Sequence, residues 1–301
     1  NVPMTPFFVY YSMFGFQRIG DLAWAAGDMR SRGFLIGGTS GRTTLNGEGL
    51  QHQDGHSHIY AATVPNCVSY DPTFGYEVAV IVQRGLERMY RDQEDVYYYI
   101  TALNENYEHP AMPEGAEEGI IKGMYLLKAA DKNASGPRVQ LLGCGAILRE
   151  VIAGAVLLEK DFGIQADIWS VTSFTELRRE AEDVERWNML NPEEPARVPY
   201  VTQCLASRGD TPVVASTDYM RLYADQIRDH VPGTFKVLGT DGFGRSDYRK
   251  ALRAHFEVDR HYVAVASLKA LADQNKIPSL KVAEAILKYG IDPGKPNPAR
   301  V

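Results

Sequence analysis

The sequence alternates short apolar runs with amphipathic segments, and this alternation constrains the fold more than any other feature. In the first third of the chain, apolar runs at 6–11, 33–36, 65–70 and 96–100 have the length and composition of buried strands. Between the first two runs, residues 14–30 place apolar side chains at the spacing of one helical face. Strands that are joined through helices predict a parallel sheet covered on both faces.

The second half of the chain repeats this pattern after a polar segment. Residues 104–119 contain two prolines and two glycines, which makes them the best domain boundary in the sequence. We expect further strands at 139–142, 166–171, 198–205, 212–216 and 235–238. We expect helices at 146–160, 261–275 and 279–289, and others that begin at Thr175 and at Ser246. One more helix, capped by Thr217 or Asp218, should extend to about Arg228. The sequence therefore predicts an α/β fold with two open, mostly parallel sheets flanked by helices, in domains 1–115 and 116–301.

Composition excludes several classes of partner. The formal net charge is −6 without any basic block, so we expect no binding to nucleic acid. No apolar run reaches the roughly 18 residues of a membrane span, and no signal peptide precedes the first strand, so we expect no membrane partner. Cys67, Cys144 and Cys204 are odd in number and widely spaced, which indicates free core thiols in a reducing cytoplasm. The chain starts almost directly with a strand and without Met, which indicates a processed chain or the rear part of a longer protein.

The most polar functional candidate is the glycine-punctuated segment 43–58. It carries Glu48, His52, His56 and His58 and follows neither a helical nor a strand period. A segment of this kind cannot bury an apolar face, and loops held by a rigid scaffold are where catalytic groups concentrate. A solvated connector that happens to be rich in histidine is the alternative, and spacing alone does not decide between the two.

The histidines of this segment fit hydrogen bonding better than metal binding. Only His56 and His58 are close in sequence and no cysteine lies nearby, so a histidine-only zinc site is weakly supported. Imidazole donates or accepts protons near neutral pH, which suits acid–base work on a polar substrate. The glycine-rich stretches 37–44 and 240–247 could bind an anion, but tight structural turns are the stronger interpretation.

Aromatic residues gather where the first expected strand passes into the first expected helix. Tyr10, Tyr11, Phe14 and Phe16 occupy this junction, which is the usual position for ligands in open parallel sheets. Core packing is the default interpretation for such aromatics.

Two longer stretches closely resemble a known family. They are Tyr10–Trp24 and Leu45–His58, and further matches occur at Leu103–Tyr107, Ala111–Glu118, Ser170–Glu176, Glu185–Met189 and Leu238–Ser246. Together they resemble the rear portion of the homodimeric pyruvate dehydrogenase family, whose members depend on thiamine diphosphate. The stretch Gly47–Gln53 also resembles the wider transketolase superfamily, but the extended match favours pyruvate dehydrogenase.

The resemblance implies a function for the full-length protein. It implies oxidative decarboxylation of pyruvate, with acetyl transfer to the lipoyl group of dihydrolipoyl acetyltransferase. Residues 1–115 would be the back of a pyrimidine-binding domain and 116–301 a transketolase-type C-terminal domain. The active site would lie between the two subunits of a homodimer. The diphosphate and Mg²⁺ would be held by an N-terminal domain that this sequence does not contain, so we expect no metal ligand here.

The resemblance also implies roles for individual residues. Phe14 would line the aminopyrimidine ring of thiamine diphosphate. Tyr11 and His52 would hydrogen-bond the pyruvate-derived adduct, and Glu48 would orient His52 or tune its pKa. His56 and His58 receive no role. Two alternatives remain: an assembly or dimerisation fragment without independent activity, and another enzyme of the transketolase superfamily.

Overall fold

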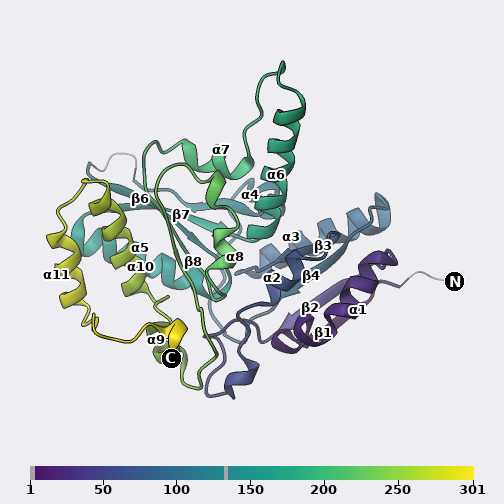
Figure 1. The fold of residues 1–301 in the computed structure, drawn as a ribbon, viewed down its shortest axis with the longest axis horizontal. Helices are drawn as coiled ribbons and strands as arrows, with labels where there is room; N and C mark the ends of the chain where they lie inside the picture. Colours follow the sequence, from purple (N-terminus) through teal and green to yellow (C-terminus); the bar gives the residue numbers. More distant parts are fainter. Residues whose placement is uncertain (1–3, 132–134) are drawn as a thin grey trace.

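The computed structural model describes residues 4–131 and 135–301, which form two sheets side by side (Figure 1). The first sheet is entirely parallel, in the order β1-β2-β4-β3, with strands β1 (Phe7–Tyr11), β2 (Phe34–Gly38), β3 (Cys67–Tyr70) and β4 (Tyr97–Thr101). The second has the order β5-β7-β6-β8-β9, with strands β5 (Met124–Lys128), β6 (Arg138–Gly143), β7 (Gln165–Val171), β8 (Val213–Ser216) and β9 (Phe235–Leu238). Among the strand pairs of the described residues, only that of β5 with β7 is antiparallel. The predicted fold class is confirmed.

Helices cover both faces of the first sheet. They are α1 (Phe16–Asp28), α2 (Ser57–Ala62), α3 (Gly75–Leu86, continued by a π-turn at Glu87–Arg91) and α4 (Ala116–Lys122). Successive side chains of β4 point to opposite faces, so Tyr97 and Tyr99 pack under α1 and α2 while Tyr98 and Ile100 pack under α3 and α4. This two-sided burial explains why the aromatic run belongs to a strand.

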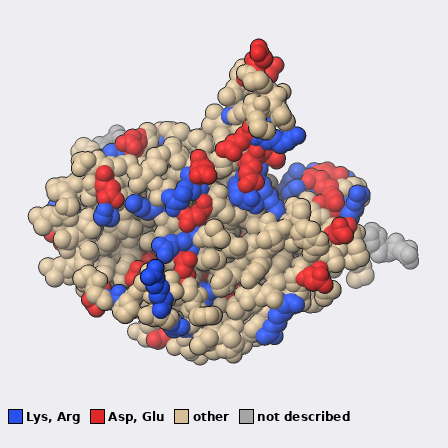
Figure 2. Space-filling view, in the orientation of Figure 1, with Lys and Arg blue, Asp and Glu red and all other residues tan. Residues whose placement is uncertain are grey.

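The second sheet is covered in the same way. Its helices are α5 (Leu148–Phe162), α6 (Phe174–Leu190), α7 (Tyr200–Ala206), α8 (Leu222–Asp225), α9 (Arg249–His255), α10 (Arg260–Asp273) and α11 (Leu280–Lys288). One face packs against α5 and α9 to α11, and the other against α6 to α8. The far end of α6 projects from the body with acidic groups at its tip, and charges of both signs are interspersed over this side of the molecule (Figures 1 and 2). In the part of the chain that the structure describes, no helix is long and apolar enough to cross a membrane.

Two of the sequence-based expectations are wrong in detail. The expected strand 198–205 is largely helix α7, because Val201 and Leu205, four residues apart, bury the same helical face. No long helix is capped by Asp218, since α8 begins only at Leu222. The Asp218 carboxylate instead accepts a hydrogen bond from the Thr43 backbone N–H at 3.2 Å. This bond links the second half of the chain to the loop that follows β2. The edge strand β5 was not expected at all.

A buried ion network joins the two halves. Arg253 of α9 hydrogen-bonds the carboxylate of Glu105, in the polar segment 104–119 that we call the connector, and lies 3.4 Å from Glu150 of α5. It also donates to Thr43 Oγ1 at 3.2 Å. Burial raises the pKa of Glu105, but hydrogen bonds and charge from Arg253 and Arg149 outweigh it and leave that pKa below its ordinary value.

Replacing Arg253 with Met should lower the free energy of unfolding by about 3 kcal/mol, because two carboxylates lose their shared buried cation and keep the partly exposed Arg149 and Arg260. Chemical denaturation followed by circular dichroism measures the change. Lys250→Met, on the exposed face of the same helix, should stay within about 0.5 kcal/mol of the wild type. Equal midpoints for the two variants would contradict the importance of the network.

Asp218 should make stability depend on pH. Burial raises its pKa to about 7, so between about pH 4 and pH 7 the folded chain binds a proton that the unfolded chain has released. Stability therefore falls as pH rises through this window. Asp218→Asn should flatten the decline in melting temperature from pH 4.5 to pH 7.5. Part of the decline should persist, because burial also raises the pKa of Asp71 to about 6. An unchanged slope, equal to that of the exposed control Asp28→Asn, would refute the assignment.

Candidate active site

The aromatic residues around the carboxyl end of β1 form two groups, one in the core and one in the candidate site. Tyr10 stacks on Tyr99 on the face of the sheet that α1 and α2 cover, with 6.3 Å between ring centroids. Phe16 packs edge-on to the ring of Tyr99. Tyr11 is exposed and Phe14 half-buried, because a 3-10 turn over Ser12–Phe14 carries the chain away from the sheet. The turn requires glycine at Gly15, where a Cβ would collide with the Tyr10 ring. Core packing, the default interpretation, therefore holds for Tyr10 and Phe16 only.

The structure brings His52 to this same edge. His52 ends a short 3-10 turn, Leu50–His52, and its ring centroid lies 5.4 Å from that of Tyr11 and 5.1 Å from that of Phe14. The Tyr11 and Phe14 centroids are 6.2 Å apart. These three rings, which we call the ring cluster, come from segments about 40 residues apart in sequence and converge where a parallel sheet places its ligands.

Charged groups border the ring cluster. Glu48 Oε2 lies 3.6 Å from His52 Nδ1, too long for a firm hydrogen bond but close enough to attract a protonated imidazole. The Arg18 guanidinium lies 4.2 Å from the centroid of the Phe14 ring, in cation–π contact. The His52 side chain keeps 27% of its surface exposed. The cluster therefore offers an aromatic surface, a phenol and an imidazole to a ligand that approaches from outside.

The other two histidines of the loop do not join the ring cluster. His58 is fully buried in α2, with Nε2 3.0 Å from Thr101 Oγ1 and its ring stacked on Tyr223. Burial lowers the pKa of His58 to about 3, so it stays neutral and structural. His56 lies 3.3 Å from the Arg42 guanidinium, and burial and then the charge of Arg42 lower its pKa. Within residues 4–131 and 135–301, no group of three or more His, Cys, Asp or Glu side chains is arranged to hold a metal ion.

Sequence reasoning missed the buried carboxylates behind the loop. Asp54 accepts the backbone N–H groups of His56 and Ser57, both at 2.9 Å, and so fixes the start of α2. Asp71 accepts from Thr101 Oγ1 at 2.6 Å and from the Tyr219 hydroxyl at 3.2 Å. Asp54 lies just before a short helix, as capping residues do, so the sequence could have indicated its role. The partners of Asp71 lie far along the chain, so no local pattern could have indicated that carboxylate.

Neither glycine-rich stretch forms an open anion site. At Gly41, with φ of 86°, a Cβ would collide with the Asp218 carboxylate, so an acid already faces the first turn. At Gly244, in the second stretch, a Cβ would collide with the Leu50 carbonyl oxygen. Both glycines serve close approach between the two halves of the molecule.

Comparison with known proteins assigns both halves to families. Residues 1–110 match the family described as the pyruvate dehydrogenase E1 component middle domain, and residues 123–259 match the transketolase-like TK C-terminal domain. Proteins named pyruvate dehydrogenase E1 component are similar over almost the whole chain. The one from Cupriavidus necator is 64% identical over 100% of this chain and 34% of its own length, and that from Pseudomonas aeruginosa 65% identical over 99% and 34%. The chain thus spans about a third of the length of these curated relatives.

Solved structures agree on the fold. A transketolase from Campylobacter jejuni superposes with a TM-score of 0.65 at 17% identity, over 88% of this chain and 36% of that one. A split gene transketolase, described as an inactive β4 tetramer, gives 0.62 at 15% identity, over 89% and 76%. With a middle domain of this kind followed by a transketolase-like C-terminal domain, and with close similarity along its whole length, the chain belongs to the pyruvate dehydrogenase E1 family.

Proposed function

We propose that this chain forms one wall of the active site of a thiamine-diphosphate-dependent pyruvate dehydrogenase. The full-length protein would decarboxylate pyruvate oxidatively and pass the acetyl group to the lipoyl group of dihydrolipoyl acetyltransferase. The observation that carries this proposal is the ring cluster at the carboxyl edge of the first sheet, within the part of the chain that matches the E1 middle domain. The names of the relatives supply the reaction class.

The ring cluster fits the aminopyrimidine part of thiamine diphosphate. Phe14 is half-buried, and its ring suits a flat heterocycle. When bound, the cofactor supplies the stabilisation of the carbanion, and the protein supplies orientation and electrostatics. The described residues do not fit the diphosphate and its Mg²⁺ in the same way, since they contain no arranged set of metal ligands. We place those ligands in the remaining two-thirds of the relatives' length, which has no counterpart in this sequence.

Tyr11 and His52 would act on the substrate. The Tyr11 hydroxyl and the His52 imidazole lie side by side in the ring cluster, where they would donate hydrogen bonds to the carboxylate and to the developing oxyanion derived from pyruvate. Glu48 Oε2 lies 3.6 Å from Nδ1 of His52 and would orient the imidazole so that Nε2 faces the substrate. Glu48 is therefore proposed as an orienting group.

We further propose that a second subunit of a homodimer completes the site. The outer strand β1 exposes about half or more of Phe7, Phe8, Val9 and Tyr11, and a long apolar sheet edge of this kind is normally covered in the assembled protein. We also propose that the two structural units divide near residue 115; α4 follows this point in the sequence, although it packs on the first sheet. The three free cysteines fit a cytoplasmic location.

Two other functions remain as competing candidates. The chain alone could be an assembly module without activity of its own, or the full protein could be another enzyme of the transketolase superfamily. The fold is shared with transketolases, so it does not separate the two substrate classes. Turnover of pyruvate compared with turnover of sugar phosphates separates them, and preference for a sugar phosphate would overturn the proposal.

His52→Ala in the full-length enzyme should lower kcat for pyruvate by about 10²-fold, because one donor to the developing charge is lost. Thermal unfolding should stay close to that of the wild type. His261→Ala, which removes a partly exposed imidazole at the start of α10, is the matched control and should leave turnover unchanged. Wild-type rates of pyruvate oxidation in the His52 variant would remove the assignment.

Thiamine diphosphate titrated calorimetrically into the purified 301-residue chain should give negligible heat with or without Mg²⁺. The physical reason is that the ring cluster would contact only the heterocyclic end of the cofactor. Tight, Mg²⁺-dependent binding to the chain alone would show that the ligands for the diphosphate lie within it.

A further inference from the structure

The loop that carries His52 is held by the second half of the molecule. Gln53, the next residue, is 1% exposed, and both ends of its side-chain amide are bonded to the main chain of Arg245. The Arg245 N–H donates to Gln53 Oε1 at 2.7 Å, and Gln53 Nε2 donates to the Arg245 carbonyl oxygen. An amide paired in this way imitates one rung of a β-ladder.

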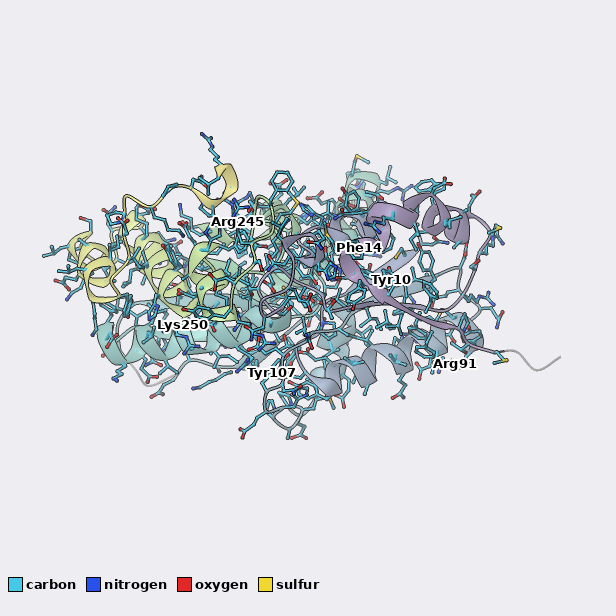
Figure 3. The ribbon with its side chains drawn as sticks, turned by 90° about the horizontal axis from the view of Figure 1, so that it is seen from below. Tyr10, Phe14, Arg91, Tyr107, Arg245 and Lys250 are labelled. Atoms are coloured by element: carbon cyan, nitrogen blue, oxygen red, sulfur yellow. The ribbon has the colours of Figure 1, made fainter. Side chains whose placement is uncertain are left out.

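Further contacts extend this pairing along both segments. The Gly47 N–H donates to the Asp247 carbonyl oxygen at 3.0 Å, and Arg249 Nε donates to the Thr44 carbonyl oxygen at 2.7 Å. At the far end of this pairing, Arg253 donates a hydrogen bond to Thr43 Oγ1. Residues 43–53 therefore run antiparallel to residues 244–253, and we call this arrangement the brace. Phe14 and Arg245 both lie toward the upper side in Figure 3, with Tyr107 toward the lower side.

The contacts of His52 within its own half are of a different kind. Tyr11 and Phe14 meet it through ring contacts, and its backbone N–H bonds to Gly49 within the same turn. Ring contacts tolerate sliding and tilting, whereas a buried amide with two hydrogen bonds fixes both distance and direction. The direction of the imidazole therefore depends on the brace more than on β1.

We propose that Gln53 is a positioning residue for decarboxylation: its bonds to Arg245 set where His52 stands over Tyr11 and Phe14. The transketolase-like C-terminal unit thereby takes part in the reaction without contributing a group that touches the substrate. This inference rests on the proposed function of His52. Gly244 belongs to the same device, because only a residue without Cβ lets the two segments approach at Leu50.

The test uses the full-length enzyme with Gln53→Met, which keeps the side-chain volume and removes both hydrogen bonds. We expect kcat for pyruvate to fall at least about tenfold with a smaller change in KM, because displacement of a reacting group by a fraction of an ångström acts on turnover. Gln51→Met, at an exposed position on the other side of His52, should keep kcat within about twofold. Gln53→Leu also removes both hydrogen bonds at a similar side-chain volume and should show the same loss of kcat; it serves if the Met variant does not fold.

A double-mutant cycle with His52→Ala shows whether Gln53 acts through His52. We expect the Gln53 substitution to have little further effect on kcat once His52 is gone. An equal fold-loss in both backgrounds, or no loss in the presence of His52, would overturn the positioning role. If His52→Ala alone leaves turnover unchanged, the proposed function fails, and the premise of this inference fails with it. A slow His52 variant beside an unaffected Gln53 variant overturns the positioning role alone.

Discussion

The buried contact of Arg253 with Glu105 and Glu150 is the interaction on which the rest of the structure depends. Each carboxylate comes from a different segment, Glu105 from the connector and Glu150 from α5, and all three side chains are about nine-tenths buried. Charges held away from water attract strongly only when every partner is in place, so the network favours one arrangement of the two halves. The bond from Arg253 to Thr43 carries that arrangement into the polar loop.

The candidate site follows from this arrangement because each half contributes what the other lacks. The first sheet supplies the carboxyl end of β1, where Tyr11 and Phe14 emerge from the core. The second half supplies no ring to the cluster, yet residues 244–253 hold the segment that delivers His52. The carboxyl end of a parallel sheet is a common position for active sites. Here the second half of the molecule holds one of the segments that form the candidate site. The contacts of residues 43–53 with residues 244–253 explain why this polar loop is well packed.

The sequence predicted the local elements better than the contacts between them. All four strands of the first sheet were expected near their observed places, because β-branched and aromatic runs between helices leave little choice. The stretch 198–205 was misjudged, since a short apolar run fits a strand or a buried helix equally well. The convergence of Tyr11, Phe14, Glu48 and His52 was expected from the family resemblance, and their roles stay a proposal. The burial of His58, the bonds of Asp71 and the pairing of Gln53 with Arg245 depend on contacts between distant segments, and no local period encodes them.

The pairing of Gln53 with Arg245 spans 192 residues of chain, and this separation has a kinetic consequence. Contacts of such long range form only after both units have collapsed and docked, because the entropy of closing so large a loop must be overcome first. The first sheet can acquire its strands early while the histidine loop is still unanchored. The final geometry of the histidine loop should therefore lag behind secondary structure during refolding, with docking of the two units as the slow event.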